Sequence, residues 1–375
     1  MKIIKKIVKK ILLFFMPIRN VIVFESIPDV SDNTQAVFDE MLKRNIQKKY
    51  KLVWVVSSRF KKPYKEKNVI YINPEKNKFR WRVFLISAKA LISCNGFLKP
   101  VRKKQLSFYL SHGMPVKSVR NYYTIPSCID YAFSTSEQLK SIYSYELNFN
   151  LDKIISLGFP RNDALTNNKV DVKGLLNTDC KKIIVWYPTF RQHSCGLKTG
   201  VKHGLPVLHD ANKAIELNET AKQNGVLIVL KPHFVQDLSY IKDLRLSNIR
   251  FINDDFYKDN GVSSYSFVGS CDALISDYSS IYFDFLLCDK PIALVWEDLE
   301  EYKREPGLIN DYEYWLQGAE KIYTLDDFKK FIVSVAKEKD LLKKERTEIC
   351  KLSNFSKDGK NSERVVDFIL EKIKY

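Results

Sequence analysis

The sequence lacks long apolar runs. No stretch of its 375 residues reaches the roughly 18 consecutive apolar residues that a membrane-spanning helix requires. Internal repeats and low-complexity segments are also absent from the sequence. Hydrophobic residues nevertheless make up 45% of the chain and aromatic residues 13%. This apolar content is enough for buried cores and argues against a disordered protein, and the length suits two domains of ordinary size.

Closely spaced cysteines are missing as well. The seven cysteines are scattered and odd in number, and no two of them form a Cys-x-x-Cys pair. Zinc sites and disulfide frameworks both require closer or paired spacing. We therefore expect no metal site, and we expect reduced, mostly buried thiols of the kind found in cytoplasmic proteins.

Acidic residues are outnumbered by basic ones. Lys and Arg total 61 against 44 Asp and Glu, which gives a formal net charge of +17. Such a charge favours polyanionic partners, namely nucleic acid, an anionic membrane face or phosphorylated substrates. The sequence contains no zinc-finger spacing, aromatic RNA-binding strand motif or basic heptad helix. We therefore expect no nucleic-acid partner.

The first nineteen residues, MKIIKKIVKKILLFFMPIR, have an amphipathic pattern. At 100° per residue, nine apolar side chains between Ile3 and Ile18 share one half of the helix circumference, and five lysines lie opposite. The pattern predicts a helix in the plane of a membrane interface, with a peripheral location on the cytoplasmic face of the cell membrane. A helix that packs on its own domain is the alternative. A secretory signal fits poorly, because the apolar run is short and no small-residue cleavage site follows.

Apolar, β-branched runs alternate with longer amphipathic stretches along the rest of the chain. This alternation predicts parallel sheets with right-handed helical crossovers. The expected strands are 21–25, 52–56, 69–72, 90–94, 106–110, 131–134 and 154–157, followed by 182–187, 226–230, 249–252, 273–276 and 291–295. The expected helices include 34–45, 79–87, 137–146, 211–224, 281–288 and 325–337.

The alternation restarts near residue 180, after a polar segment without periodicity. We therefore predict an α/β protein with two Rossmann-like domains that face a cleft, the architecture called GT-B, in which ligands bind at the carboxyl ends of the strands. The expected divisions are an amphipathic helix over residues 1–19, an acceptor domain over 20–170 and a donor domain over 171–375. The basic tail from residue 339 is expected to be helical.

Two polar segments follow strands of the first half. Ser-His-Gly-Met-Pro-Val-Lys places His112 and Gly113 at the end of strand 106–110. An imidazole with a pKa near 6.5 can take a proton from a hydroxyl group there, although a structural histidine is the more frequent case. Gly-Phe-Pro-Arg-Asn-Asp follows strand 154–157. Its Arg161 and Asp163 are expected to lock the turn by a salt bridge.

Two further segments follow strands of the second half. Tyr-Pro-Thr-Phe-Arg contains Thr189 and Arg191 at the end of strand 182–187. A guanidinium at that position can bind a phosphate through two oxygens at once, which a lysine does less well. Lys-Pro-His places Lys231 and His233 at the end of strand 226–230. These side chains put potential cations at one edge of the second sheet.

The most specific segment is Ala-Leu-Ile-Ser-Asp-Tyr-Ser-Ser-Ile-Tyr-Phe-Asp, over residues 273–284. A buried strand runs into Asp277 and then into Ser279 and Ser280, which are expected at the N-cap and first turn of a helix. Hydroxyl groups and unpaired backbone N–H groups at a helix start favour an anion. The segment predicts a diphosphate cradle without a glycine-rich loop. In isolation, an ordinary serine N-cap is the more frequent explanation.

Taken together and in order, HGxPxK, GxPRxD, PTxR, KPH and DYSSxxFDF resemble the CDP-glycerol glycerophosphotransferase family of teichoic-acid and capsule synthesis. The resemblance runs from about His112 to about Gly307. A following Lys-Pro-Ile and the Asp298, Tyr302 pair are similar to the family's next segment. The spacing after Tyr302 departs from the family pattern, which leaves the identity of the polyol open.

The resemblance implies a transferase that moves glycerol phosphate, or a similar polyol phosphate, from a CDP-activated donor to a lipid-linked or polymeric acceptor in cell-wall synthesis. It implies no cofactor beyond the donor substrate. The implied catalytic residues are His112 and His233. The implied donor-phosphate ligands are Arg191, Lys231, Ser279 and Ser280, with Gly113, Arg161, Asp163, Thr189 and Asp277 in support. A nucleotide-sugar glycosyltransferase of surface polysaccharide synthesis, on the same GT-B fold, is the alternative.

Overall fold

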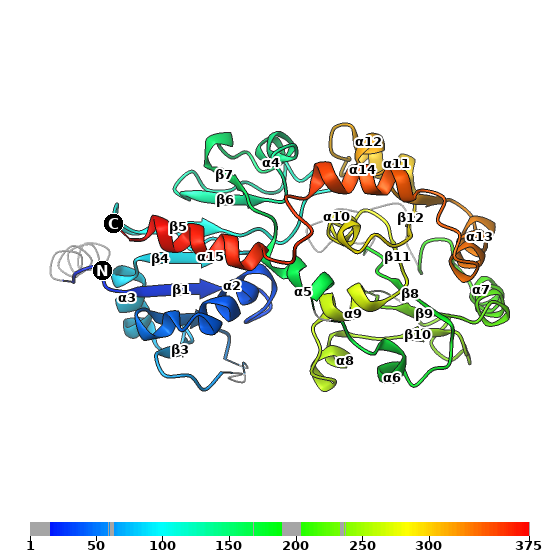
Figure 1. The fold of residues 1–375 in the computed structure, drawn as a ribbon, viewed down its shortest axis with the longest axis horizontal. Coiled ribbons are helices and arrows are strands. Elements are labelled where there is room, and N and C mark those ends of the chain that lie inside the picture. Colours follow the sequence, from blue (N-terminus) through cyan, green and yellow to red (C-terminus); the bar gives the residue numbers. More distant parts are fainter. Residues whose placement is uncertain are drawn as a thin grey trace. The chain divides into compact units, whose positions relative to one another are not determined.

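The structure, a computed structural model, describes residues 16–58, 60, 64–167, 169–189, 204–232, 236 and 238–374. It divides into two compact units, each of which contains its own parallel sheet (Figure 1). The first unit comprises residues 1–112, 123–163 and 360–375, and the second comprises 113–122 and 164–359. The α/β class with two parallel-sheet domains is thus confirmed. Residues 1–15 of the expected N-terminal amphipathic helix lie outside the described residues.

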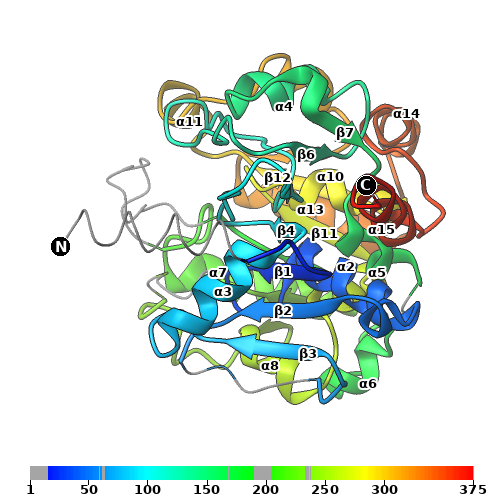
Figure 2. The same cartoon turned by 90° about the vertical axis from the view of Figure 1, so that its left-hand side faces the viewer.

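The first unit is built on a seven-stranded sheet of the order β3-β2-β1-β4-β5-β6-β7 within the described residues. Every neighbouring pair is parallel, and β1, β2 and β3 run side by side in Figure 2. Its strands are β1 (Val21–Glu25), β2 (Lys51–Val55), β3 (Val69–Ile72), β4 (Ala90–Ser93), β5 (Leu106–Tyr109), β6 (Tyr131–Ser134) and β7 (Ile154–Ser156). Its helices are α2 (Asp32–Lys43), α3 (Lys78–Ser87), α4 (Lys140–Glu146) and α15 (Asn361–Lys372).

The strands of the first unit are apolar on both faces because helices cover both faces. Alternate residues of β1 belong to different cores. Ile22 and Phe24 pack in a cluster that includes Val365 and Ile369 of α15. Val21 and Val23 pack instead with residues of α3 and with the loop that follows β4. The two faces of the sheet are therefore distinct environments.

The second unit is built on a six-stranded sheet of the order β10-β9-β8-β11-β12-β13, also parallel throughout the described part. Its strands are β8 (Lys182–Trp186), β9 (Val226–Leu230), β10 (Ile249–Phe251), β11 (Ala273–Ser276), β12 (Ile292–Val295) and β13 (Glu320–Ile322). Its longer helices are α7 (Ala211–Gln223), α13 (Leu325–Ala336) and α14 (Lys343–Ser353). Shorter ones are α6 (Val172–Leu176), α8 (Asp254–Asp259), α9 (Ser264–Ser270), α10 (Ile281–Phe285), α11 (Leu299–Arg304) and α12 (Tyr312–Trp315), and α5 (Asp163–Asn167) begins at the boundary between the units.

All twelve expected strands are present, with ends that differ by at most one residue. The sequence missed β13, whose three residues Glu-Lys-Ile have no alternation long enough to detect. The expected helix 281–288 is α10 followed by a 3-10 turn, Leu286–Cys288. No helix among the described residues is both long enough and apolar enough to cross a membrane.

Two segments belong to a different unit from the one that their position in the sequence suggested. The last residues, which include α15, return to the first unit and pack against α2 (Figure 1). Residues 113–122 belong to the second unit. There the backbone N–H of Ser118 donates to the Gly307 carbonyl at 2.9 Å, and that of Ile309 donates to the Val116 carbonyl at 3.1 Å. The physical reason is backbone pairing between segments far apart in the sequence, which local patterns do not report.

Candidate functional site

His112 follows β5 at the carboxyl edge of the first sheet, and its ring is exposed. Its Nδ1 lies 3.4 Å from the carbonyl oxygen of Cys94 and 3.5 Å from the hydroxyl of Tyr109. A carbonyl can only accept, so the contact with Cys94 favours the tautomer with the proton on Nδ1. That tautomer leaves the basic lone pair on Nε2. The arrangement suits a group that accepts a proton.

The turn around His112 has an unusual backbone. Ser111 has a φ of +60° and Gly113 a φ of +147°. A positive φ is uncommon for a residue with a side chain and is often found at functional sites. At Gly113 the same property explains the glycine, because residues with a Cβ rarely adopt that φ.

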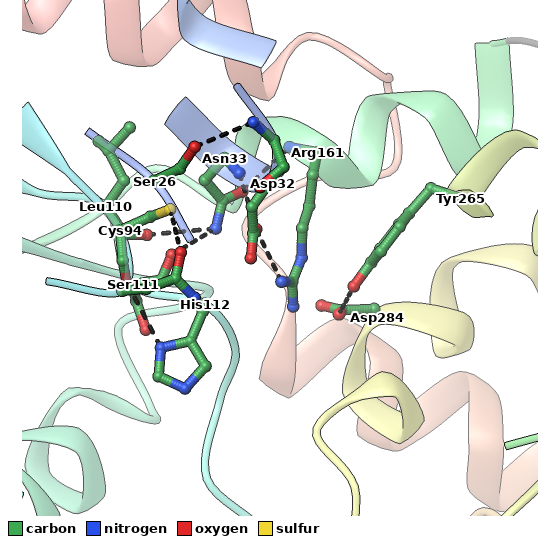
Figure 3. Close-up of polar contacts among 12 residues, drawn as sticks. Ser26, Asp32, Asn33, Cys94, Leu110, Ser111, His112, Arg161, Tyr265 and Asp284 are labelled. Atoms are coloured by element: carbon green, nitrogen blue, oxygen red, sulfur yellow. Dashed lines mark hydrogen bonds and ion pairs between the residues drawn. The ribbon is translucent and has the colours of Figure 1, made fainter. Parts of the chain in front are cut away.

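Asn33, near the start of α2, holds this turn in place and was not identified from the sequence. Its fully buried side chain donates to the carbonyls of Leu110 at 3.3 Å and Ser111 at 2.8 Å (Figure 3). Its Oδ1 accepts from the backbone N–H of Arg161 at 3.0 Å. Asn33 thus joins the loops that follow β5 and β7. The Ser-Asp-Asn-Thr run at residues 31–34 is a typical helix start, and nothing in the sequence indicates these distant partners.

Arg161 and Asp163 each have partners that the sequence did not indicate. Arg161 forms an ion pair with Asp32 at 2.8 Å, and both side chains are largely buried. Asp163 accepts from the backbone N–H groups of Asn361 at 2.8 Å and Ser362 at 2.7 Å, at the start of α15. The salt bridge between Arg161 and Asp163 stays a prediction, beside these other partners. Asp163 thus binds N–H groups at a helix N-terminus, which have no partner within the helix itself.

Asp277 and Thr189 are brought together at the carboxyl edge of the second sheet. The Asp277 carboxylate, fully buried, accepts from the backbone N–H of Thr189 at 2.8 Å and also from its hydroxyl. Ser276 adds a hydrogen bond from its hydroxyl to the Tyr187 carbonyl at 2.9 Å. The loops after β8 and β11 are consequently fixed to each other. Asp277 acts through hydrogen bonds to the loop.

Tyr278 connects this hydrogen-bond network to the segment that follows β12. Its ring stacks on Tyr302 with centroids 3.5 Å apart, and its hydroxyl donates to Asp298 at 3.0 Å. Asp298 and Tyr302 are the pair that the sequence placed in the following motif. The edge of the second sheet is therefore braced across β8, β11 and β12 by buried side chains.

Ser279 and Ser280 follow this braced segment and are half-buried. Ser280 is the N-cap residue of α10 and makes no side-chain capping bond, so it precedes the first turn instead of lying in it. Among the described residues, neither serine hydroxyl has a hydrogen-bond partner. Both hydroxyls can therefore serve a ligand. Within the same unit, the hydroxyl of Tyr265 donates to Asp284 of α10 at 2.7 Å (Figure 3).

The other residues predicted to bind the donor phosphates are Arg191, which follows β8 in the sequence, and Lys231 and His233, which follow β9. Lys231 forms an ion pair with Asp254 at 3.0 Å, and its ammonium lies 5.7 Å from the ring centroid of Tyr187. A phosphate ligand therefore has to compete with Asp254 for this lysine. Arg191 and His233 lie outside the described residues.

A further ion pair, which the sequence did not indicate, lies where β12 ends. His209 Nε2 is 2.7 Å from one oxygen of Glu297, and the other oxygen accepts from the Val207 N–H at 2.7 Å. Burial raises the pKa of Glu297, but the bonds from His209 and Val207 outweigh this and hold the pKa below its usual value. Val207 itself has a φ of +69°. Glu297 therefore holds a strained backbone segment.

Comparisons with known proteins agree with the motifs. The family model of CDP-glycerol:poly(glycerophosphate) glycerophosphotransferases matches residues 8–371. A teichoic acid glycerol-phosphate transferase of Staphylococcus aureus is 28% identical over 82% of this chain and 82% of that protein. A teichoic acid poly(glycerol phosphate) polymerase of Bacillus spizizenii is 25% identical over 93% and 91%.

The fold has solved counterparts. The structure of the wall teichoic acid polymerase TagF superposes with a TM-score of 0.72 and 20% identity, over 95% of this chain and 89% of that one. The family model covers nearly the whole chain, and the described residues of the ordered motifs lie at the carboxyl edges of the two sheets. The chain belongs to the CDP-glycerol:poly(glycerophosphate) glycerophosphotransferase family and is a transferase of that class.

Proposed function

We propose that this enzyme transfers glycerol phosphate from CDP-glycerol to a hydroxyl of a lipid-linked or polymeric acceptor in teichoic-acid or capsule synthesis. The observation that carries the proposal is the match of the family model to residues 8–371. Ribitol phosphate is the second choice of transferred group, because the sequence departs from the family pattern after Tyr302. We also propose that the two domains face a cleft in which the substrates bind, as in GT-B transferases.

The first sheet edge supplies the acceptor side of the proposed mechanism. His112, through Nε2, takes the proton of the acceptor hydroxyl as its oxygen attacks the phosphorus that bears glycerol. Asn33 and Arg161 hold the loops around this histidine. The new bond joins the acceptor oxygen to phosphorus, and the bond from phosphorus to the oxygen of CMP breaks.

The second sheet edge supplies the donor side. Ser279 and Ser280 offer hydroxyl groups to the diphosphate, with Lys231 and Arg191 as cations. Transfer of this kind is catalysed mainly by stabilising charge on the phosphoryl and leaving groups. His233 binds a phosphate oxygen or protonates the departing CMP. Thr189 and Asp277 keep the loops of this edge in position.

The test is CMP release from CDP-glycerol, CDP-ribitol and a UDP-sugar, each with and without a short oligo(glycerol phosphate) acceptor. We expect CMP from CDP-glycerol and a rate that rises with acceptor. Turnover of the UDP-sugar alone would reject the proposal in favour of a glycosyltransferase.

We also propose that the enzyme is a peripheral protein of the cytoplasmic membrane face, held there by residues 1–19. Deleting residues 2–18 should release the protein from anionic vesicles and spare activity on a short soluble acceptor, because β1 begins only at Val21. Replacing the lysines of this segment with Gln should weaken binding only partly, because the apolar side chains of the segment still bind the membrane without the charges. Co-sedimentation of a truncated protein as complete as that of the full chain would contradict the proposal.

A further inference from the structure

Glu25 is a carboxylate at the carboxyl edge of the first sheet. It is the last residue of β1, and its side chain is half-buried. Within the described part of the chain, no hydrogen bond or ion pair reaches it. Burial raises the pKa of Glu25 above its usual value, because nothing nearby offsets the lost hydration. Because Glu25 is only half-buried at the open end of a strand, its carboxylate is accessible to a ligand.

The register of the sheet places Glu25 on the same face as the His112 contact. Glu25 is the Cα partner of Ser93 in β4, and Ser93 is the Cα partner of Tyr109 in β5. Residues in register across parallel strands project to the same side of a sheet. Tyr109 is the residue whose hydroxyl lies 3.5 Å from His112 Nδ1. Glu25, Ser93 and Tyr109 therefore form one row across the sheet. The imidazole of His112 lies beside the Tyr109 end of that row.

The turn after β4 lies between these two groups. Its first residue, Cys94, contributes the carbonyl that His112 contacts. Its third residue, Gly96, faces Glu25, because a Cβ built there would stand 3.3 Å from the Glu25 Oε2. The strands that carry the two groups are two spacings apart, about 10 Å. A small residue at position 96 thus leaves room for the carboxylate at the open edge of the sheet.

The chemistry of the site selects one kind of ligand. An ionised carboxylate only accepts hydrogen bonds, so it binds hydroxyl groups well and repels phosphate. The acceptor in the proposed function carries both hydroxyl groups and phosphodiesters. A negative side chain at this edge suits the uncharged, hydroxyl-bearing end of the acceptor better than its phosphodiesters.

We propose that Glu25 accepts a hydrogen bond from a hydroxyl of the acceptor and so orients the polyol end of that substrate toward His112. The assignment rests on the proposed function and deepens it, because it names the group that recognises the acceptor. Glu25 is a specificity residue here, and the proton of the attacking hydroxyl still passes to His112. Gly96 supports it by leaving the carboxylate unobstructed.

The experiment measures steady-state kinetics of CMP release by the full chain. CDP-glycerol is the donor, and an octyl-linked di(glycerol phosphate) is the acceptor probe. The variants are Glu25→Ala, Glu25→Gln and Gly96→Ala. Glu320→Ala is the matched control, since Glu320 is also half-buried with a raised pKa but starts β13, at the opposite end of a strand.

We expect Glu25→Ala to raise the acceptor KM at least about tenfold, the scale of a lost hydrogen bond to a charged group. The donor KM should stay within about twofold. Glu25→Gln should retain part of the affinity, because an amide oxygen still accepts, and Gly96→Ala should shift the acceptor KM in the same direction by less. The melting temperature should stay or rise, because removing the half-buried Glu25 carboxylate relieves a desolvation cost.

Two outcomes overturn the assignment while leaving the proposed function intact. One is an acceptor KM in Glu25→Ala that matches wild type. The other is a parallel loss of acceptor affinity, donor affinity and melting temperature, which would make Glu25 a structural residue. A folded wild-type protein that releases no CMP from CDP-glycerol would instead reject the proposed function, and the assignment with it.

Discussion

The carboxyl edges of the two sheets are built in opposite ways. In the first unit the side chains at the edge include an exposed His112 and a Glu25 that has no partner among the described residues, and Asn33 holds the loops together. In the second unit, Asp277 and Tyr278 bind neighbouring loops through buried contacts. The hydroxyls of Ser279 and Ser280 have no partner among the described residues and are left for a ligand. The first edge offers reactive groups, and the second offers a rigid frame.

This difference fits a division of labour between acceptor and donor. A group that takes a proton needs access and a suitable tautomer, and His112 has both. A diphosphate needs donors fixed in advance, because preorganised dipoles stabilise charge without reorganising during the reaction. The buried hydrogen bonds of Asp277 supply that rigidity. Variants at the two edges should therefore fail in different ways.

The largest effect is expected from His112→Ala. Turnover should fall at least about 100-fold, the scale of lost acid-base assistance. The melting temperature should not change, because the ring is exposed. His209→Ala is the control, since it removes an ion-paired histidine of the second unit and should lower the melting temperature slightly with near-normal turnover. Near-normal turnover in His112→Ala would remove its role as base.

A smaller effect on turnover, with a loss of stability, is expected from Asn33→Ala. The change removes the hydrogen bonds that Asn33 makes to the Ser111 carbonyl and the Arg161 N–H, each worth about 0.5–1.5 kcal/mol. Turnover should fall about tenfold as the turn carrying His112 loosens, with the donor KM unchanged.

The matched control for Asn33 is Asn218→Ala in α7. Asn218 is also buried and accepts from the Asn248 N–H at 2.8 Å, but it lies away from either set of motifs. It should lose stability without losing turnover per folded molecule. Equal turnover losses in the two variants would show that Asn33 only stabilises the fold.

The smallest effect concerns Lys321 of β13, whose burial lowers its pKa to about 7. The unfolded chain then binds more protons than the folded one between about pH 7 and the ordinary lysine pKa near 10.4. Stability should therefore rise with pH across that window, and the cost of burying the charge is complete below it. In Lys321→Met, the melting temperature should increase less over this pH window than in the wild type, by a few degrees. An unchanged pH dependence in the variant would mean that Lys321 stays charged, held by the Leu316 and Ala319 carbonyls.

The elements that the sequence predicted well depend on local patterns. Apolar runs gave the strand positions, because a strand covered on both faces must be apolar along its length. The position of the motifs at strand ends followed from the same reasoning, and the structure has Thr189 and Asp277 in contact there.

The errors concern partners that lie far apart in the chain. Asp163 binds residues 198 and 199 positions away, and Asn33 binds carbonyls 77 and 78 positions away. Such pairs follow from packing, which a single sequence does not report. Glu25 was missed for a related reason. Its place at the end of a strand was known, but the absence of a partner is visible only in three dimensions.

The comparison of the two edges is tested by calorimetric titration of CDP-glycerol into three proteins: wild type, His112→Ala and the double variant Ser279→Ala with Ser280→Ala. The division of labour predicts wild-type donor affinity in His112→Ala and a loss of about tenfold or more in the double variant, which removes two hydrogen-bond donors to a charged ligand. Wild-type affinity in the serine variant, with weakened binding in His112→Ala, would place the donor at the first edge and contradict the assignment of both sheets.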